Sequence, residues 1–371
     1  MTPGPTQVPE ACRLALARQV THHRTPEFRA IHAELIAGLQ EIFQTRNDIV
    51  TIAGSGTAGM EAAVASVLPR GGKAIVLESG KFSERWRILC ERFGIEVVRY
   101  ELPWGEPFDA GRVAELLDEH PDAMAVYATL CETSTGVGHD IRAIGRVVAK
   151  SKALFIVDGI SSVGAMECRT DDWGIDILVV GSQKALMGPP GLAFLAISPT
   201  AWKQIESIDR QAFYLDLIAY RKSLETNDTP YTPLRFLMEA MLENVRQLRA
   251  EGIEAVWSRI ERLAAATRAG LEALGLELVP RRPAEAMTAA YLPEGIDAKA
   301  FLGRLEARFG IKPAGGQGPL SGRIFRIGHF GQIDELDIVG VVAAVELLLA
   351  EYARIDMLGK GTQAVLAVLG S

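Results

Sequence analysis

The sequence is poor in the features that mark disulfide-rich and metal-binding proteins. Its 371 residues include four cysteines and six histidines, and no two cysteines form a CxxC pair. Scattered cysteines of this kind predict reduced thiols and a cytoplasmic protein. The adjacent His22 and His23 are a poor metal pair, because neighbouring side chains point apart in both helices and strands. We therefore expect no metal ion.

Charge and hydropathy argue against two further classes of protein. Lysine and arginine total 39 against 46 acidic residues, a net charge of −7, and no basic tract is present, which argues against a dedicated nucleic-acid binder. The longest apolar stretch, residues 338–350, contains Glu346 and is too short to span a bilayer. The opening residues MTPGPTQVPE lack a signal-peptide pattern. We expect neither membrane nor nucleic acid as a partner.

The sequence does contain a regular alternation of strand-like and helix-like segments. The expected strands are residues 49–53, 73–77, 96–100, 123–129, 153–157, 177–180 and 192–197. Several are continuous apolar runs, typical of strands buried on both faces. The helical patterns between them include residues 60–68, 84–93, 109–120 and 141–151. Repeated strand–helix–strand units predict an α/β fold with a mainly parallel sheet, in which the last two strands can pair antiparallel.

The pattern changes to α+β after about residue 200. A long helical pattern covers residues 234–274, and it is followed by short strands at 276–280 and 288–292, a helix at 298–309, a glycine-rich loop at 314–318, a strand at 323–328 and a helix at 334–352. We predict a large α/β domain over residues 15–245 and a smaller α+β domain over 246–371, joined by the N-terminal segment 1–14. The tail 354–371 has no evident packing partner.

A glycine-rich turn follows the first expected strand and opens a helix. Gly54, Gly56 and Gly59 fit GxGxxG, and Glu78 ends the next strand, which is the pattern of a dinucleotide site. An NAD-linked oxidoreductase is therefore one hypothesis. The free N–H groups of a helix N-terminus, with the hydroxyls of Ser55 and Thr57, suit any phosphate. A tight turn with an ordinary N-cap is the structural alternative.

An acid and a lysine follow two of the buried strands. Asp158 ends one apolar run, and Lys184 follows the next in the segment GSQK. The carboxyl ends of parallel strands meet at one edge of a sheet, so both groups should lie near the glycine turn. Asp158 capping a loop and Lys184 in solvent are the alternatives. Together the three features suit pyridoxal 5′-phosphate (PLP), which has a phosphate, an aldehyde that reacts with lysine and a ring nitrogen that favours an acid.

Several motifs in this order resemble a known family. They are GSGTAGMEAA (54–63), ETSTGV (132–137), VDGISSVGA (157–165), GSQKALMGPPGLAF (181–194), FYLDL (213–217), TPYTP (229–233) and GRIFRIGHFG (322–331). The sequence resembles the class V PLP-dependent aminotransferases, in particular the alanine/serine–glyoxylate branch. The resemblance implies the type I fold of PLP enzymes, with a mainly parallel seven-stranded sheet, a smaller α+β C-terminal domain and a homodimer with active sites at the interface.

The resemblance also implies an activity. The amino group of a small L-amino acid (alanine, serine or aspartate) passes to a 2-oxo acid such as glyoxylate or pyruvate, by ping-pong turnover through a pyridoxamine form. Lys184 is implied to bind PLP covalently and to shuttle a proton. Asp158 is implied to pair with the pyridinium nitrogen. Arg326 is implied to bind the substrate α-carboxylate, which a guanidinium grips in a bidentate way; a surface salt bridge is its alternative.

The remaining implied roles are contacts to the cofactor. Ser55, Gly56, Thr57 and Gln183 are implied to contact the phosphate, and Thr232 to contact the phosphate bound in the neighbouring subunit. Phe82 is implied to stack on the ring, and Ser134 to contact the region of the ring oxygen. Thr229 is the weaker candidate for the role of Thr232, and Phe82 can instead be a core residue.

Some positions depart from the family pattern and leave the substrate open. They are His22, Leu130, Cys131, Gly159 and Gly188. A PLP lyase or cysteine desulfurase is an alternative of the same fold, but it needs a cysteine in a mobile glycine- or serine-rich loop, and none is evident in the sequence. A non-catalytic interaction subunit that keeps the fold is the other alternative.

Overall fold

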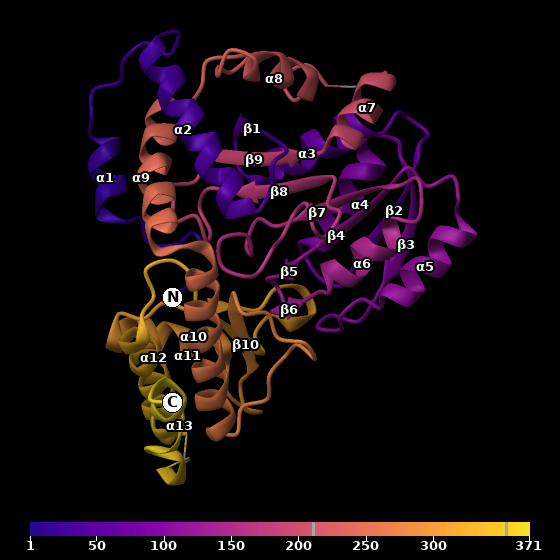
Figure 1. Ribbon diagram of the computed structural model, residues 1–371. Coiled ribbons are helices and arrows are strands. Elements are labelled where there is room, and N and C mark those ends of the chain that lie inside the picture. Colours follow the sequence, from indigo (N-terminus) through magenta and orange to yellow (C-terminus); the bar gives the residue numbers. More distant parts are fainter. Residues whose placement is uncertain (210–211, 353–354) are drawn as a thin grey trace.

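A large sheet forms the centre of the upper part of the molecule in the computed structural model, which describes residues 1–209, 212–352 and 355–371 (Figure 1). Within these residues it has seven strands in the order β1-β9-β8-β7-β4-β2-β3. They are β1 (Asp48–Ala53), β2 (Lys73–Glu78), β3 (Glu96–Glu101), β4 (Ala125–Thr129), β7 (Leu154–Asp158), β8 (Ile177–Gly181) and β9 (Leu192–Ile197). The bounds agree with the sequence prediction to within two residues.

The sheet is parallel except at β9. This strand pairs antiparallel with both β8 and β1, so β1 runs in the same direction as the other strands. The remaining pairs are parallel. The antiparallel pairing of the last two strands is thereby confirmed. The arrangement also places the ends of β1, β7 and β8 at the same edge of the sheet.

Helices cover both faces of the large sheet, because side chains alternate along each buried strand. In β7, Phe155 and Val157 pack into one core, and Leu154 and Ile156 pack into the other. The first core contains α2 (Pro26–Phe43), α5 (Ala110–Glu119), α6 (Ile141–Val148) and α9 (Arg235–Glu251). The second contains α3 (Gly56–Val67), α4 (Ser83–Arg92), α7 (Pro199–Ser207) and α8 (Leu217–Leu224). Helix α1 (Glu10–Leu16) packs on α9.

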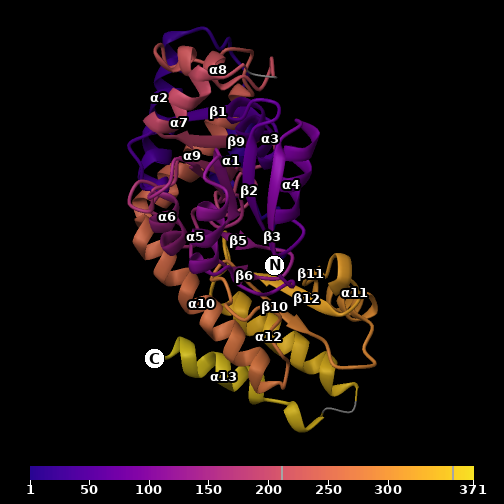
Figure 2. The same cartoon turned by 90° about the vertical axis from the view of Figure 1, so that its right-hand side faces the viewer.

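A smaller antiparallel sheet lies below the large one (Figure 2). In the described ranges its order is β10-β12-β11, and a separate hairpin joins β5 and β6. The bounds are β10 (Met287–Tyr291), β11 (Ala314–Gly315), β12 (Ile324–Gly328), β5 (Cys131–Glu132) and β6 (Val137–Gly138). The accompanying helices are α10 (Ile253–Ala273), α11 (Ala298–Phe309), α12 (Glu335–Ala350), α13 (Lys360–Leu369) and the 3₁₀ turns η1 (Gly318–Leu320) and η2 (Ile355–Met357).

Two expectations for the second half are wrong. The helical pattern 234–274 is two helices, α9 and α10, that meet at Gly252, whose φ of 85° is a conformation that side chains rarely adopt. Residues 276–280 form no regular strand. Leu278 makes an isolated bridge to Ala290, so the segment follows β10 irregularly.

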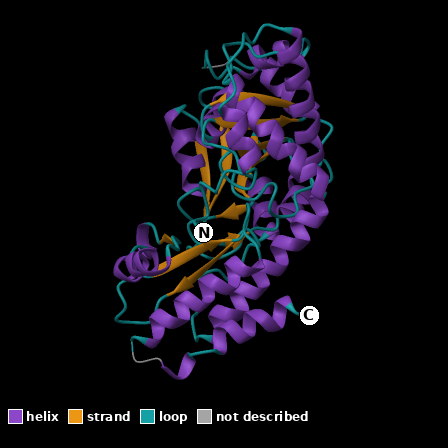
Figure 3. Cartoon of the chain, turned by 90° about the vertical axis from the view of Figure 1, so that its left-hand side faces the viewer, coloured by secondary structure: helices purple, strands orange, loops and turns teal. Residues whose placement is uncertain are grey.

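The tail has a packing partner that its sequence did not reveal. Helix α13 lies along α10, as Figures 1 and 3 show. Gly270 and Gly361 allow the close approach, because a Cβ on either would come within 3 Å of Val365 or Leu274 respectively. Of the predicted tail, Arg354 lies outside the described residues.

The N-terminal segment passes between the two sheets, where the three ribbon views place the chain end (Figures 1, 2 and 3). The amide of Gly328, at the end of β12, donates to the carbonyl of Met1 at 3.0 Å. The amide of Thr6 donates to the carbonyl of Gln183 at 3.1 Å. The segment therefore ties the small sheet to the loop that carries Lys184. Among the described residues, no helix is long and apolar enough to cross a membrane.

Candidate functional site

A cavity of about 280 Å³ opens at the carboxyl edge of the large sheet. This size is close to the lower end of small-molecule sites, about 300 Å³. The loops after β1, β7 and β8 meet here, as the parallel arrangement requires. The predicted site residues that line the cavity are Ser55, Gly56, Thr57, Phe82, Asp158, Gln183 and Lys184. The glycine turn, the acid and the lysine therefore line one cavity, and the roles assigned to these residues stay predictions.

Lys184 is half-buried in the loop that follows β8. Its Nζ donates to the carbonyl of Pro3 at 2.8 Å. Gly4 lies directly against it, since a Cβ there would stand 2.3 Å from Lys184 Cδ. Burial lowers the pKa of the Lys184 amine to about 8, with Asp158 opposing the effect. A neutral amine, the form that attacks an aldehyde, is therefore well populated near pH 8.

Asp158 ends β7 and faces the same cavity. Its Oδ1 accepts the amide of Ile160 at 2.8 Å. Burial raises the pKa of this carboxyl to about 7, against the lowering effect of that hydrogen bond. A buried carboxylate of this kind favours a cationic partner, and a protonated ring nitrogen is one.

The start of α3 forms an anion cradle. Ser55 is the N-cap residue but its side chain makes no capping hydrogen bond, so its hydroxyl is available to a ligand. Gly56 lines the cavity and has no room for a side chain, because a Cβ there would stand 2.5 Å from Ile160 Cδ1. Within the described residues, Gln183 Oε1 is buried without a hydrogen-bond partner. The donors at this end of the cavity are the Ser55 and Thr57 hydroxyls and the backbone N–H groups that open α3, and with Asp158 and Lys184 in the same cavity the residues present fit PLP.

Glu132 holds the segment that carries Phe82 in place, and the sequence analysis did not predict this role. Its carboxylate has no exposed area and accepts the amides of Phe82 and Ser83 at 3.0 and 2.8 Å. It also accepts the Ser134 hydroxyl at 2.6 Å. The negative charge sits at the start of α4, where the helix dipole favours it. Glu132 thus fixes the position of Phe82, whose ring centroid lies 6.0 Å from Lys184 Nζ. The one sequence signal that could have indicated this role is that Glu132 is the acidic residue of the motif ETSTGV.

Ser134 and Arg326 lie next to the cavity without lining it. The Ser134 hydroxyl bonds to Glu132 and accepts the amide of Lys81 at 3.0 Å. Arg326 is only 6% exposed, and its Nη1 donates at 2.5 Å to the carbonyl of Thr133, a residue of the cavity wall. Burial lowers the pKa of the Arg326 guanidinium to about 10. In the described ranges it forms no ion pair, so the surface salt bridge is not seen.

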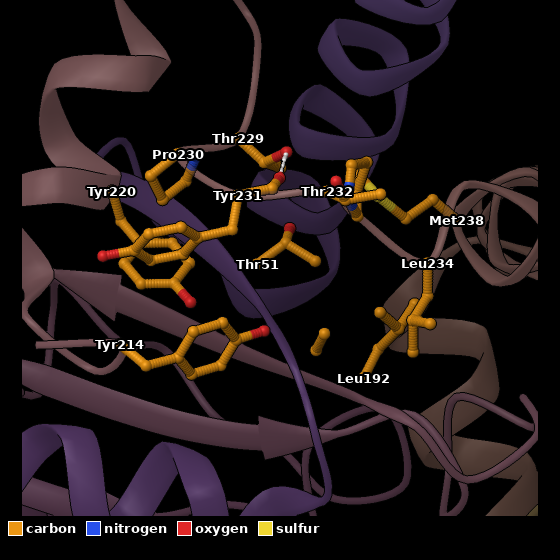
Figure 4. A pocket seen from close by; sticks show the side chains of 12 residues that line it. Thr51, Leu192, Tyr214, Tyr220, Thr229, Pro230, Tyr231, Thr232, Leu234 and Met238 are labelled. Atoms are coloured by element: carbon orange, nitrogen blue, oxygen red, sulfur yellow. Dashed lines mark hydrogen bonds between the residues drawn. The ribbon is translucent and has the colours of Figure 1, made fainter. Parts of the chain in front are cut away.

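Thr232 lies in a different pocket of the chain. Figure 4 shows it with Thr51 and Met238, across from the rings of Tyr214 and Tyr231. This pocket has a volume of about 10 Å³, room for roughly one water. Thr229, the weaker candidate, donates to the carbonyl of Tyr231 at 2.8 Å. Neither threonine lines the Lys184 cavity of its own chain, and a role in the partner subunit stays a prediction.

The positions that depart from the family pattern have different surroundings. Cys131 lines the Lys184 cavity, and burial raises the pKa of its thiol, so the thiol is a poor nucleophile. Leu130 lines a separate cavity of about 350 Å³. A Cβ on Gly159 would stand 2.5 Å from Val163 Cγ2, which explains the glycine by packing. The carbonyl of His22 accepts Arg235 Nη1 at 2.5 Å, away from the cavity.

Glu78 does not behave as a ribose-binding acid. Its carboxylate forms ion pairs with Arg87 at 3.0 Å and with Arg99 at 2.5 Å. The dinucleotide hypothesis therefore loses the acid that the GxGxxG pattern needs. In the described part of the chain, no group of three or more His, Cys, Asp or Glu is placed to hold a metal ion.

Comparison with known proteins identifies the family. The family model described as aminotransferase class-V matches residues 9–318. The chain belongs to the class V aminotransferases. The L-aspartate–glyoxylate aminotransferase of Paracoccus denitrificans is 35% identical over 98% of this chain and 93% of its own. A Synechococcus protein named soluble hydrogenase, small subunit, is 40% identical over 100% of this chain and 98% of its own.

A solved structure agrees with this assignment. The ureidoglycine–glyoxylate aminotransferase of Bacillus subtilis superposes with a TM-score of 0.95 and 31% identity, covering 100% of this chain and 97% of that one. The predicted fold of PLP-dependent transferases and the predicted enzyme class, a transaminase, are confirmed. Membership of this class V family implies pyridoxal 5′-phosphate as the cofactor.

Proposed function

We propose that this class V aminotransferase transfers the amino group of alanine, serine or aspartate to glyoxylate or pyruvate. The observation that carries the proposal is one cavity that is lined by Lys184, Asp158 and the start of α3. The names of relatives that act on glyoxylate support this acceptor. Since a donor amino acid becomes a 2-oxo acid as the acceptor becomes an amino acid, no other reactant is required.

The chain's own residues divide the work. PLP, when bound, takes up the amino group and disperses the negative charge that develops at the substrate's Cα. Lys184 Nζ removes the proton from Cα as a general base, and its pKa near 8 suits proton transfer close to neutral pH. The carboxylate of Asp158 keeps the ring nitrogen protonated. Ser55, Gly56 and Thr57 hold the phosphate at the start of α3.

We also propose that two copies form a homodimer in which Thr232 reaches the phosphate of the neighbouring subunit. Thr232 and its loop do not line the cavity of their own chain. Near this loop Phe213 is 82% exposed, and Tyr214 stacks on Tyr231 at a centroid distance of 5.0 Å. Exposed aromatic side chains of this kind are enriched in the cores of protein interfaces.

A screen of half-reactions tests the proposed substrates. The yellow holoenzyme is mixed with single amino acids, and bleaching of its absorbance reports amino-group transfer. We expect bleaching by L-alanine, L-serine or L-aspartate, and recovery of the colour on addition of glyoxylate or pyruvate. D-alanine is the matched control and should leave the spectrum unchanged. A protein that binds PLP but is bleached by none of the three donors contradicts the proposal.

Replacing Arg326 with alanine should weaken the binding of both substrates. A charge-assisted pair with a carboxylate is worth about 1.5–3 kcal/mol, so we expect KM for the donor and for the acceptor to rise roughly 10- to 100-fold. Arg326→Lys should recover only part of this, because lysine lacks the bidentate fork. Steady-state kinetics with both substrates measures the effect.

The matched control is Arg323→Ala, an exposed arginine at the start of the same segment. Its KM values should stay within about twofold of wild type, as expected for a surface substitution. Unchanged KM values for both substrates in Arg326→Ala would show that another residue binds the carboxylate.

A further inference from the structure

Arg85 is a cationic residue of the cavity to which the sequence analysis gave no role. It lies in the first turn of α4, three residues after Phe82, and its side chain lines the same cavity as Lys184 and Asp158. Its Nη1 donates to the hydroxyl oxygen of Thr57 at 3.0 Å. Arg85 thus connects α4 to the first turn of α3, where the anion cradle begins.

We propose that Arg85 is a phosphate-binding residue, which contacts the cofactor's phosphate and turns the Thr57 hydroxyl toward it. The proposal rests on the PLP site described above and adds a residue that determines selectivity for the phosphorylated cofactor. It places the guanidinium at the phosphate end of the cavity, whereas Arg326, whose Nη1 donates to the carbonyl of Thr133, is left for the substrate.

The hydrogen bond from Arg85 determines the direction in which the Thr57 hydroxyl can donate its proton. A threonine hydroxyl has one O–H donor and two acceptor lone pairs. Because Arg85 Nη1 donates to the Thr57 oxygen, one lone pair is used and the O–H group is free to donate elsewhere. Thr57 is the second residue of α3, where backbone N–H groups are also unsatisfied. A phosphate oxygen in the cradle is the acceptor that both groups suit.

A phosphate also requires more positive charge than the start of α3 supplies. A phosphate ester carries a charge of about −1.5 to −2 near pH 7, whereas a helix N-terminus offers only about +0.5. Among the described residues that line the cavity, Arg85 and Lys184 are the cationic ones. Since Lys184 is needed at the aldehyde, Arg85 is the full positive charge that remains for the phosphate.

The positive charge of Arg85 is not neutralised by an ion pair within the described residues. Over the described ranges, no aspartate or glutamate forms an ion pair with it. Its neighbour Glu84 pairs instead with Lys81 at 2.7 Å and with Arg87 at 3.4 Å. An arginine on a cavity wall with a hydroxyl as its hydrogen-bond partner is able to take an anionic ligand bidentately.

A purely structural role is the competing explanation. The guanidinium carbon of Arg85 lies 5.4 Å from the centroid of the Phe82 ring, so it can also support that ring by a cation–π contact. This role concerns the ring face of the cofactor and not its phosphate. The two explanations therefore differ in their effect on a cofactor that has no phosphate.

The test compares PLP with pyridoxal, which lacks the phosphate, as ligands of the cofactor-free protein. Dissociation constants come from spectral titration of wild type, Arg85→Ala, Arg85→Lys and the control Arg92→Ala, an exposed arginine at the end of α4. For Arg85→Ala we expect PLP affinity to fall roughly 10- to 100-fold and pyridoxal affinity to change less than about threefold. Arg85→Lys should be intermediate, and Arg92→Ala should match wild type.

Each other outcome overturns the inference. Equal losses for PLP and pyridoxal in Arg85→Ala would mean that the residue only supports the Phe82 ring. An unchanged PLP affinity in Arg85→Ala would contradict the phosphate role. If the KM for aspartate then rises relative to wild type by more than the KM for alanine does, Arg85 is a substrate-binding residue. If Arg85→Ala does not fold, an Arg85→Lys protein with wild-type selectivity for PLP over pyridoxal contradicts the role of the fork. Failure of wild type to bind PLP covalently would overturn the proposed site itself.

Discussion

Lys184→Ala should lose the covalent bond to PLP and at least about 10³-fold of its turnover. Two roles disappear at once, since the amine is both the nucleophile for the aldehyde and the general base for the substrate Cα proton. General acid–base catalysis alone contributes about 10²- to 10⁴-fold. Borohydride treatment followed by peptide mass analysis should find the cofactor attached to the Lys184 peptide in wild type and absent from it in the variant.

Two matched variants separate the amine from the charge. Lys184→Arg keeps a cation but cannot supply a neutral amine, so it should be as inactive as Lys184→Ala. Lys203→Ala removes an exposed lysine from α7 and should behave as wild type. If borohydride treatment still attaches the cofactor to the Lys184→Ala protein, another lysine is the one that reacts with PLP.

The pKa of Lys184 adds a pH dependence to the same prediction. Only the neutral amine attacks an aldehyde, and burial lowers this pKa to about 8. The rate of PLP capture by the cofactor-free protein should therefore rise from pH 6.5 to pH 9 and level off above. A free lysine of ordinary pKa, about 10.4, would still be rising steeply at pH 9. Stopped-flow mixing across this range distinguishes the two profiles.

The large sheet was predictable because its strands carry their own signal. Runs such as β9, whose six residues are all apolar and are all buried in the structure, are typical of central strands of a covered sheet. Once the strands are parallel, the rule that they end at one edge brings Asp158 and Lys184 together without further information. The second half was less predictable. Helix α13 is held by contacts with α10, which lies about a hundred residues earlier, and no local pattern reports such a contact.

The same distinction separates the predicted site residues from the missed ones. Asp158 and Lys184 follow apolar strands directly, so their positions are local information. The carbonyl of Pro3 meets Lys184 across 181 residues of sequence, and Glu132 meets Phe82 across 50. Arg85 follows Phe82 on one helix, but its value depends on Thr57, 28 residues away. Contacts between residues so far apart in sequence are determined by the fold, and the spacing of residues in the sequence does not predict them.

Asp158→Asn should reduce turnover at least about 100-fold while the fold is kept. The amide has the same shape and can still accept the Ile160 amide, which reaches Asp158 Oδ1 at 2.8 Å. It carries no charge, however, and cannot keep the ring nitrogen protonated, so the charge that develops at Cα is less well dispersed. We expect kcat to fall with little change in the KM of either substrate, because the substitution leaves the proposed contact between Arg326 and the substrate carboxylate untouched.

Although Asp158→Asn should reduce turnover, the same substitution should increase the stability of the cofactor-free protein. The pKa of Asp158 is about 7 in the folded chain, above its ordinary value, because burial disfavours the charged form. The folded state therefore binds more protons than the unfolded state between about pH 4 and pH 7. Stability falls as pH rises through this window, and the loss persists above it.

Asp158→Asn removes that loss, because it has no charge to bury. At pH 8 the cofactor-free variant should unfold at a higher denaturant concentration than wild type. Its free energy of unfolding should be larger by up to a few kcal/mol, since one pKa unit corresponds to about 1.4 kcal/mol. At pH 4 the two should unfold alike, since Asp158 is protonated in the folded wild type. The control Asp109→Asn alters an exposed N-cap that asparagine serves equally well, so it should show no pH-dependent difference.

Addition of PLP should reverse this order. A protonated ring nitrogen beside Asp158 compensates the buried charge, so wild type should gain more stability from PLP than Asp158→Asn does. A structural aspartate predicts a different result, in which the variant is destabilised with and without cofactor. The acid at the end of β7 is thus expected to weaken the empty protein and strengthen the loaded one. This sign change is the signature of a residue retained for its cofactor and not for its fold.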